Sequence, residues 1–195
     1  MRHPLEFIPN PYRRRIFFVF LTLMLVMFAV LRVVDEPLHT EVAPNGIVSF
    51  ELAGTAQAAR AITDSWKQMS LLLSAVAGQS NPDIVNTPYV FAAFSLGIDY
   101  LFMPIYALAL ALGTLLARQR HKGLVRSLGA VAGYAALSAP VFDAVENYSL
   151  LRVLLGEFQS GYPALAAFCA IIKFGLIAFA LLYSIFAWLS PKKSP

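Results

Sequence analysis

Three polar residues stand within one turn of each other inside a long apolar stretch, where they could carry out acid–base chemistry. Asp143, Glu146 and Asn147 lie in the apolar stretch 138–155. Their spacings of three and four residues place the side chains on one face of a helix. Ionisable groups at membrane depth are costly, and they usually face a bundle interior or a watery cavity. The pattern predicts a buried polar site in which neighbouring carboxyls hold or transfer a proton.

Two other apolar stretches contribute one charge each, Asp99 and Lys173. At 1.5 Å per helical residue, each lies about 15 Å from the start of its stretch. Glu146 and Asp143 lie about 14 and 18 Å from the end of theirs. The matched depths predict that these four residues converge in one cavity as candidate catalytic residues.

The charges also indicate what else the site contains. Three acids and one lysine carry a net charge of minus two when all are ionised, which a dry interior does not tolerate. Either one acid is protonated or a cation joins: a metal ion, an arginine or a ligand amine. The sequence assigns no metal and leaves the cofactor open. The candidate ligand-binding residues are Asn147, Tyr100, Tyr106, Arg60 and Glu51.

Composition places the chain in a membrane. Hydrophobic residues make up 58% of the 195 and charged residues 13%, which is too apolar for an ordinary soluble domain. The histidines all lie in polar segments, which argues against a haem or di-metal centre with histidine ligands. The net charge of +4 comes from basic residues that flank apolar segments, so no nucleic-acid partner is expected.

The apolar segments predict four membrane-spanning helices. The first could be a cleaved signal peptide, but its uncharged run is sixteen residues long and no small-x-small cleavage site precedes Asp35. These features favour an uncleaved anchor. The four spans are expected at about residues 16–34, 89–117, 124–155 and 163–189.

Between the first two spans, residues 35–88 form the predicted outer loop. A helical pattern from about 50 to 77 indicates an amphipathic helix, with Trp66 near the membrane interface. The apolar stripe of this helix comprises Leu52, Ala56, Ala59, Ile62 and Trp66. The predicted fold is all-α, one membrane domain of residues 1–195 consisting of a four-helix bundle with an extra amphipathic helix on the outer, periplasmic side.

Orientation follows from the basic residues. The amino-terminal lead, the loop between spans two and three, and the tail hold ten of the fifteen Lys and Arg. Cytoplasmic loops carry such an excess. We expect a multi-pass protein of the bacterial inner membrane with both termini in the cytoplasm.

Four short motifs resemble those of a group of uncharacterised bacterial four-span membrane proteins. The resemblance covers about residues 50–185 and implies that the outer helix and the three polar spans belong to one unit. The group has no known activity. The motifs are Glu51-Leu52-Ala53-Gly54-Thr55, Asp99-Tyr100-Leu101-Phe102, Asp143-x-x-Glu146-Asn147 and Lys173-Phe174.

Three functions fit these observations. The site could bind or process a lipid or other amphiphile, with Lys173 engaging an anionic or carbonyl group and Asp99 setting the charge of Lys173. Alternatively, the chain is an accessory or scaffold subunit whose polar cluster only fixes helix packing. An ion-coupled carrier is a third option, although four spans show no inverted repeat. The expected partners are membrane lipids, an amphiphilic ligand, and either another membrane protein or a second copy.

The topology can be tested by cysteine labelling from one side of the membrane. In a Cys169→Ser background, single cysteines at Lys192 and Glu51 should react with an impermeant reagent from opposite sides. Labelling of both positions from the same side would contradict the four-span orientation.

Overall fold

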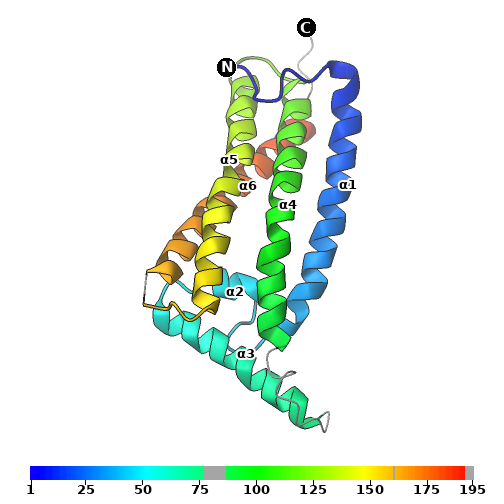
Figure 1. Cartoon of the computed structure of the whole chain (residues 1–195). Coiled ribbons are helices and arrows are strands. Elements are labelled where there is room, and N and C mark those ends of the chain that lie inside the picture. Colours follow the sequence, from blue (N-terminus) through cyan, green and yellow to red (C-terminus); the bar gives the residue numbers. More distant parts are fainter. Residues whose placement is uncertain (77–86, 160, 192–195) are drawn as a thin grey trace. The chain divides into compact units, whose positions relative to one another are not determined.

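The computed structural model describes residues 1–76, 87–159 and 161–191, and the regular elements of these ranges are all helical (Figure 1). α1, α4, α5 and α6 are long and apolar enough to cross a membrane, which confirms four spans near the predicted positions. The elements are α1 (Asn10–Asp35), the short 3-10 helix η1 (Glu36–Leu38), α2 (Ile47–Glu51), α3 (Ala56–Val76), α4 (Thr87–Arg118), α5 (Gly123–Leu154) and α6 (Tyr162–Leu189).

The chain divides into two compact units, and each long helix contributes residues to both. Unit 1 comprises Met1–Phe28, Leu101–Asp143 and Ile172–Pro195, and unit 2 comprises Ala29–Tyr100 and Ala144–Ile171. Unit 1 contains eleven of the fifteen Lys and Arg but only two of the eleven Asp and Glu. Positive charge is therefore concentrated in unit 1 and negative charge in unit 2.

Small residues let the helices of unit 1 approach closely. One buried cluster joins Ala117 of α4, Ala132 of α5, and Tyr183 and Ala187 of α6. A Cβ atom added to Gly113 of α4 would lie 3.4 Å from a ring carbon of Phe17 and 3.7 Å from the hydroxyl of a serine on α6. Close contacts at small residues are typical of helices that associate in lipid, where side-chain packing takes the place of the hydrophobic effect.

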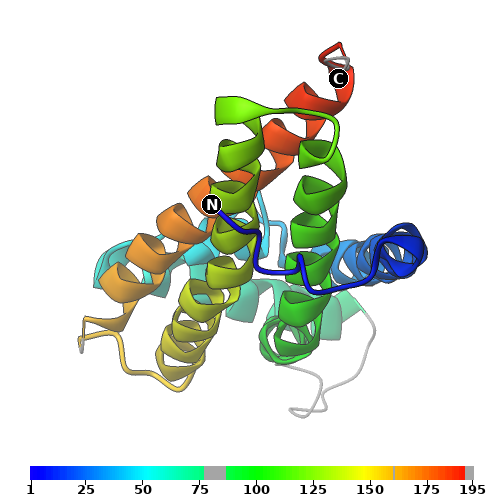
Figure 2. The ribbon, with the colours of Figure 1, turned by 90° about the horizontal axis from the view of Figure 1, so that it is seen from above.

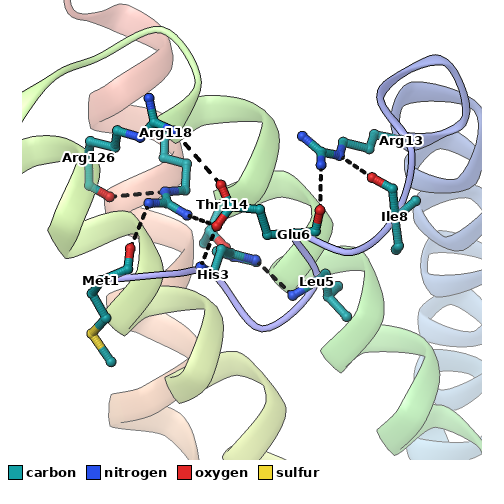
Figure 3. A network of polar contacts seen from close by, with 9 residues as sticks. All are labelled: Met1, His3, Leu5, Glu6, Ile8, Arg13, Thr114, Arg118 and Arg126. Atoms are coloured by element: carbon teal, nitrogen blue, oxygen red, sulfur yellow. Dashed lines mark hydrogen bonds and ion pairs between the residues drawn. The ribbon is translucent and has the colours of Figure 1, made fainter.

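The first nine residues form a folded segment that crosses the end of α4 in unit 1 (Figure 2). His3 is buried, with Nε2 3.0 Å from Thr114 Oγ1 and with Nδ1 accepting a hydrogen bond from the Leu5 amide (Figure 3). On α5, a side chain at Gly133 would collide with the His3 ring. A glycine is therefore needed where His3 is seated.

Arg118, at the end of α4, contacts the amino-terminal segment through a hydrogen bond and an ion pair (Figure 3). It is 3% exposed, its Nη2 donates to the Met1 carbonyl and its Nε donates to the Arg126 carbonyl. Its Nη1 lies 3.6 Å from a carboxylate oxygen of Glu6. The sequence counted Arg118 among the basic loop residues, but in the structure it joins the amino-terminal segment to α4 and α5.

Unit 2 has its own core, which is centred on Trp66 of α3. Trp66 is fully buried, its ring lies 5.2 Å from that of Phe50 and 6.4 Å from that of Tyr89, and its Nε1 donates to the Leu38 carbonyl at 2.9 Å. The one polar atom of the indole is therefore satisfied inside the protein, so the side chain does not need contact with water. The position of Trp66 near the membrane interface stays a prediction.

The helix predicted from about 50 to 77 is divided into α2 and α3. Gly54 adopts a φ of +67°, and the Thr55 hydroxyl accepts a hydrogen bond from the Ala58 amide, which caps the start of α3. Leu52 consequently precedes α3 and is 46% exposed, although it was placed on the buried stripe. Ala59, Ile62 and Trp66 of that stripe are buried as predicted. Residues 77–86, where this helix was expected to end, lie outside the described residues.

Stability should depend on pH through His3. Burial, followed by the nearby Arg118 guanidinium, lowers the pKa of His3 from 6.5 to about 4. His3 therefore binds a proton at a higher pH in the unfolded chain than in the folded chain. The stability that neutral, buried His3 gives to the folded state is complete above pH 6.5 and is lost as the pH falls toward 4. We expect the free energy of unfolding to fall by about 1–3 kcal/mol between pH 7 and 4.5 on this account.

The measurement is thermal unfolding in detergent at several pH values, comparing wild type with His3→Gln. Both proteins keep His39 and His121, so the difference between their profiles reports His3. Identical profiles would contradict the burial of a neutral His3.

Candidate functional site

The first polar cluster joins three helices of unit 1. Lys173 Nζ on α6 donates to Asp143 Oδ1 on α5 at 3.1 Å, and the Tyr106 hydroxyl on α4 donates to Asp143 Oδ2 at 2.8 Å. The three residues are 5%, 2% and 4% exposed. Asp143 therefore uses both carboxylate oxygens to hold an ammonium and a phenol in fixed positions.

This arrangement can do more than join helices. A carboxylate between an ammonium and a phenol orients both groups and can exchange a proton with either. Lys173 Nζ also lies 4.7 Å from the ring centroid of Phe174. Aromatic faces attract cations, so the Phe174 ring adds a favourable contact for the ammonium.

The second polar cluster lies in unit 2. Asn147 on α5 is 1% exposed, and its Nδ2 donates to Asp99 Oδ2 at 2.9 Å and to the Leu96 carbonyl at 3.2 Å, both on α4. Asp99 itself is only half-buried. The amide thus connects α4 to α5 and holds the carboxylate of a partly accessible acid.

Two glutamates of unit 2 are also removed from solvent. Glu146 on α5 is fully buried, and Glu51 at the end of α2 is 8% exposed. Glu51, a predicted ligand-binding residue, lies in α2 and not in the same helix as Trp66, so its side chain does not follow the helical phase of α3.

The remaining predicted ligand-binding residues are more exposed. Tyr100 is 41% exposed, and its hydroxyl donates to the Ala144 carbonyl in unit 2. Arg60 is exposed, with its guanidinium carbon 4.6 Å from the ring centroid of Phe158. Their roles as ligand-binding residues stay predictions.

The structure thus gathers the predicted residues into two clusters. Unit 1 joins Lys173, Asp143 and Tyr106, and unit 2 joins Asp99 and Asn147. The convergence of all four charges in one cavity stays a prediction. Small residues are buried along the same helices, at Ala166, Cys169, Ala170 and Ala180 of α6 and at Gly133 and Ala136 of α5.

The described residues contain no group of three or more His, Cys, Asp and Glu arranged to hold a metal ion. Cys169 is buried on α6. The two clusters supply carboxylates, the Lys173 amine, the Tyr106 phenol and the Asn147 amide.

Sequence reasoning missed the polar network of His3, Thr114 and Arg118. His3 occurs in a short polar lead with no periodic pattern, and Thr114 is a single hydroxyl in an apolar helix. The only sequence signal is the pair Gly129 and Gly133 on α5, four residues apart. Added Cβ atoms there would collide with Tyr183 and His3 respectively.

Comparisons of the chain with protein-family models, curated proteins and solved structures gave no match. The resemblance to a four-span bacterial group accordingly stays a prediction, and the function must be argued from the two clusters.

Neutralising the two α5 acids should have unequal effects. Asp143→Asn removes the carboxylate that pairs with the buried Lys173 ammonium, and breaking such a pair costs about 3–5 kcal/mol. Because the two acids of α5 cannot cheaply both be charged, Glu146→Gln should be tolerated better. The measurement is thermal unfolding of both variants in the same detergent.

The double variant Lys173→Met/Asp143→Leu is the control for this interpretation. Removing both charges should recover most of the stability that Asp143→Asn loses, because neither member of the ion pair is then buried without the other. Equal and complete loss of folding in Asp143→Asn and Glu146→Gln would indicate that each acid belongs to an indispensable ion pair of its own.

Proposed function

We propose that this protein binds or processes a lipid or other amphiphile through the Lys173–Asp143–Tyr106 cluster. The observation that carries the proposal is a lysine–aspartate pair at 3.1 Å, almost fully buried in helices apolar enough to span a membrane. Ionisable residues are rare within membrane helices and mark substrate or proton pathways.

The third member of the cluster supports a role beyond packing. A structural ion pair needs two groups, and Asp143 here also holds the Tyr106 hydroxyl. In the proposed role, Lys173 engages an anionic or carbonyl group of the amphiphile. Asp143 holds the proton that moves, and Tyr106 donates a hydrogen bond to the carboxylate or to the ligand.

The proposed orientation follows from the segregation of charge. Unit 1 contains the amino-terminal segment, the basic turn between α4 and α5, and the end of α6, and it carries most of the Lys and Arg. The positive-inside rule assigns these segments to the cytoplasm of a bacterial cell and the acidic loops of unit 2 to the periplasm. The site would then receive amphiphiles from the outer leaflet.

A second candidate function is that of a scaffold subunit. It is favoured by the mutual satisfaction of Lys173 and Asp143, since such pairs can hold helices together in lipid. The most apolar stretch of α1 has none of its residues buried in this chain, so its surface could meet lipid or a helix of another subunit.

The two functions differ in what the purified protein should carry. Wild type and Lys173→Met are purified in the same detergent, and their bound lipids are compared by native mass spectrometry. If Lys173 engages the amphiphile, the variant should lose at least about tenfold of the retained lipid, because a hydrogen bond to a charged group contributes about 1.5–3 kcal/mol.

Lys67→Met is the matched control, since Lys67 is an exposed lysine on α3 that pairs with Asp64. The double variant Lys173→Met/Asp143→Leu removes the risk that an unpaired Asp143 unfolds the protein. If folded wild type, Lys173→Met and the double variant carry the same lipids in equal amounts, the amphiphile proposal fails and the scaffold function is retained.

A further inference from the structure

We propose that one end of unit 1, where α1 begins, α4 ends and α5 begins, binds the headgroups of anionic phospholipids. The exposed cations there are Arg2, Arg14, Arg15 and Lys122, and we call this set the basic end. The proposal is independent of the proposed function, because the cluster around Lys173 uses other residues. It assigns a partner to the positive charge that is concentrated in unit 1.

Hydrogen bonds bring distant parts of the chain together at this end. Arg118 of α4 donates to the Met1 carbonyl at 3.1 Å. Arg13 of α1 donates to the Glu6 carbonyl at 2.7 Å, so the amino-terminal segment runs over the end of α4 toward the start of α1 (Figure 2). Arg120, in the turn after α4, donates at 2.9 Å to a carbonyl of α6. Cations that are far apart in the sequence therefore lie at the same end of unit 1.

Unit 1 supplies little negative charge to balance these cations. One of its two acids, Asp143, is buried and paired with Lys173. The other, Glu6, lies 3.6 Å from a guanidinium nitrogen of Arg118 and 3.8 Å from one of Arg126 (Figure 3). Within the described part of the chain, no carboxylate forms an ion pair with the four cations of the basic end. Such a surplus of exposed positive charge attracts an anionic partner.

The aromatic residues at this end favour a lipid over a nucleic acid or an acidic protein. Tyr12 and Trp188 are both exposed, and the Arg120 guanidinium carbon lies 4.9 Å from the ring centroid of Trp188. Tyr and Trp gather where acyl chains meet headgroups. The helices α1 and α6, which carry these two rings, are apolar enough to span a membrane. Clusters of Lys and Arg next to such helices bind the phosphate groups of anionic lipids.

The experiment compares an anionic lipid with a zwitterionic one. The full chain in detergent is equilibrated with equal amounts of phosphatidylglycerol and phosphatidylethanolamine with identical acyl chains, and bound lipids are counted by native mass spectrometry. We expect wild type to retain at least about tenfold more phosphatidylglycerol, since each cation near an anionic headgroup contributes about fivefold. Raising the ionic strength should reduce this preference, because salt screens exposed charges.

The test variant is Arg14→Gln/Arg15→Gln, which should lower the preference for phosphatidylglycerol at least about fivefold. Both side chains are exposed, so the buried contacts of unit 1 stay intact. Arg14→Lys/Arg15→Lys keeps the charge and should keep most of the preference. Arg32→Gln/Lys67→Gln removes two exposed cations from unit 2, so it matches the net charge of the test variant and should bind like wild type.

Three results would overturn the assignment. They are equal retention of the two lipids by wild type, an unchanged preference in folded Arg14→Gln/Arg15→Gln, and an equal loss of preference in Arg32→Gln/Lys67→Gln. The last would trace the preference to net charge and not to the basic end. The readout here is the ratio of two lipids, whereas Lys173→Met is judged by the total lipid retained, so the two proposals can fail separately.

Discussion

A lysine ammonium buried between apolar helices must have a carboxylate beside it, and this requirement constrains unit 1. At 3.1 Å the attraction between Lys173 and Asp143 is about 5 kcal/mol for an effective dielectric constant near 20, which is comparable to the several kcal/mol needed to desolvate each ion. The pair therefore contributes little net stability, but separating its members would be costly. Tyr106 adds α4 to the same carboxylate, so one residue of α5 fixes the axial positions of three helices relative to one another within unit 1.

Close approach of the backbones is what makes such contacts possible. The buried faces of α4, α5 and α6 in unit 1 are rich in alanine and glycine, and short side chains bring polar groups within hydrogen-bond distance. Gly133 likewise leaves room for the His3 ring, which reaches Thr114 because α5 has no side chain at this position. Unit 2 is instead held together by a core around Trp66, whose Nε1 donates to the Leu38 carbonyl and so joins α3 to η1.

The polar groups of the two units have different chemical characters. In unit 1 the acid and the base satisfy each other, and a ligand would have to compete with Asp143 for Lys173. In unit 2 the Asn147 amide donates to two acceptors of α4, the Asp99 carboxylate and the Leu96 carbonyl, so the contact there is an amide-centred one without an ion pair between its members.

The sequence by itself determined the class of this protein. Long apolar segments and polar residues at helical spacing predict helices apolar enough to span a membrane and the faces that turn inward, because hydrophobicity and helical period are local properties. The same periodicity identified Asp143, Asn147 and Lys173 as inward-facing. Only the tertiary structure decided which groups pair: that Lys173 bonds to Asp143, that Asn147 holds Asp99, that Glu51 and Trp66 are buried, and that His3 and Arg118 close the amino-terminal segment. The paired residues are 28 to 117 positions apart in the sequence, or they follow a break in a helix. Hydropathy and spacing along the chain cannot predict how close two helices come to one another.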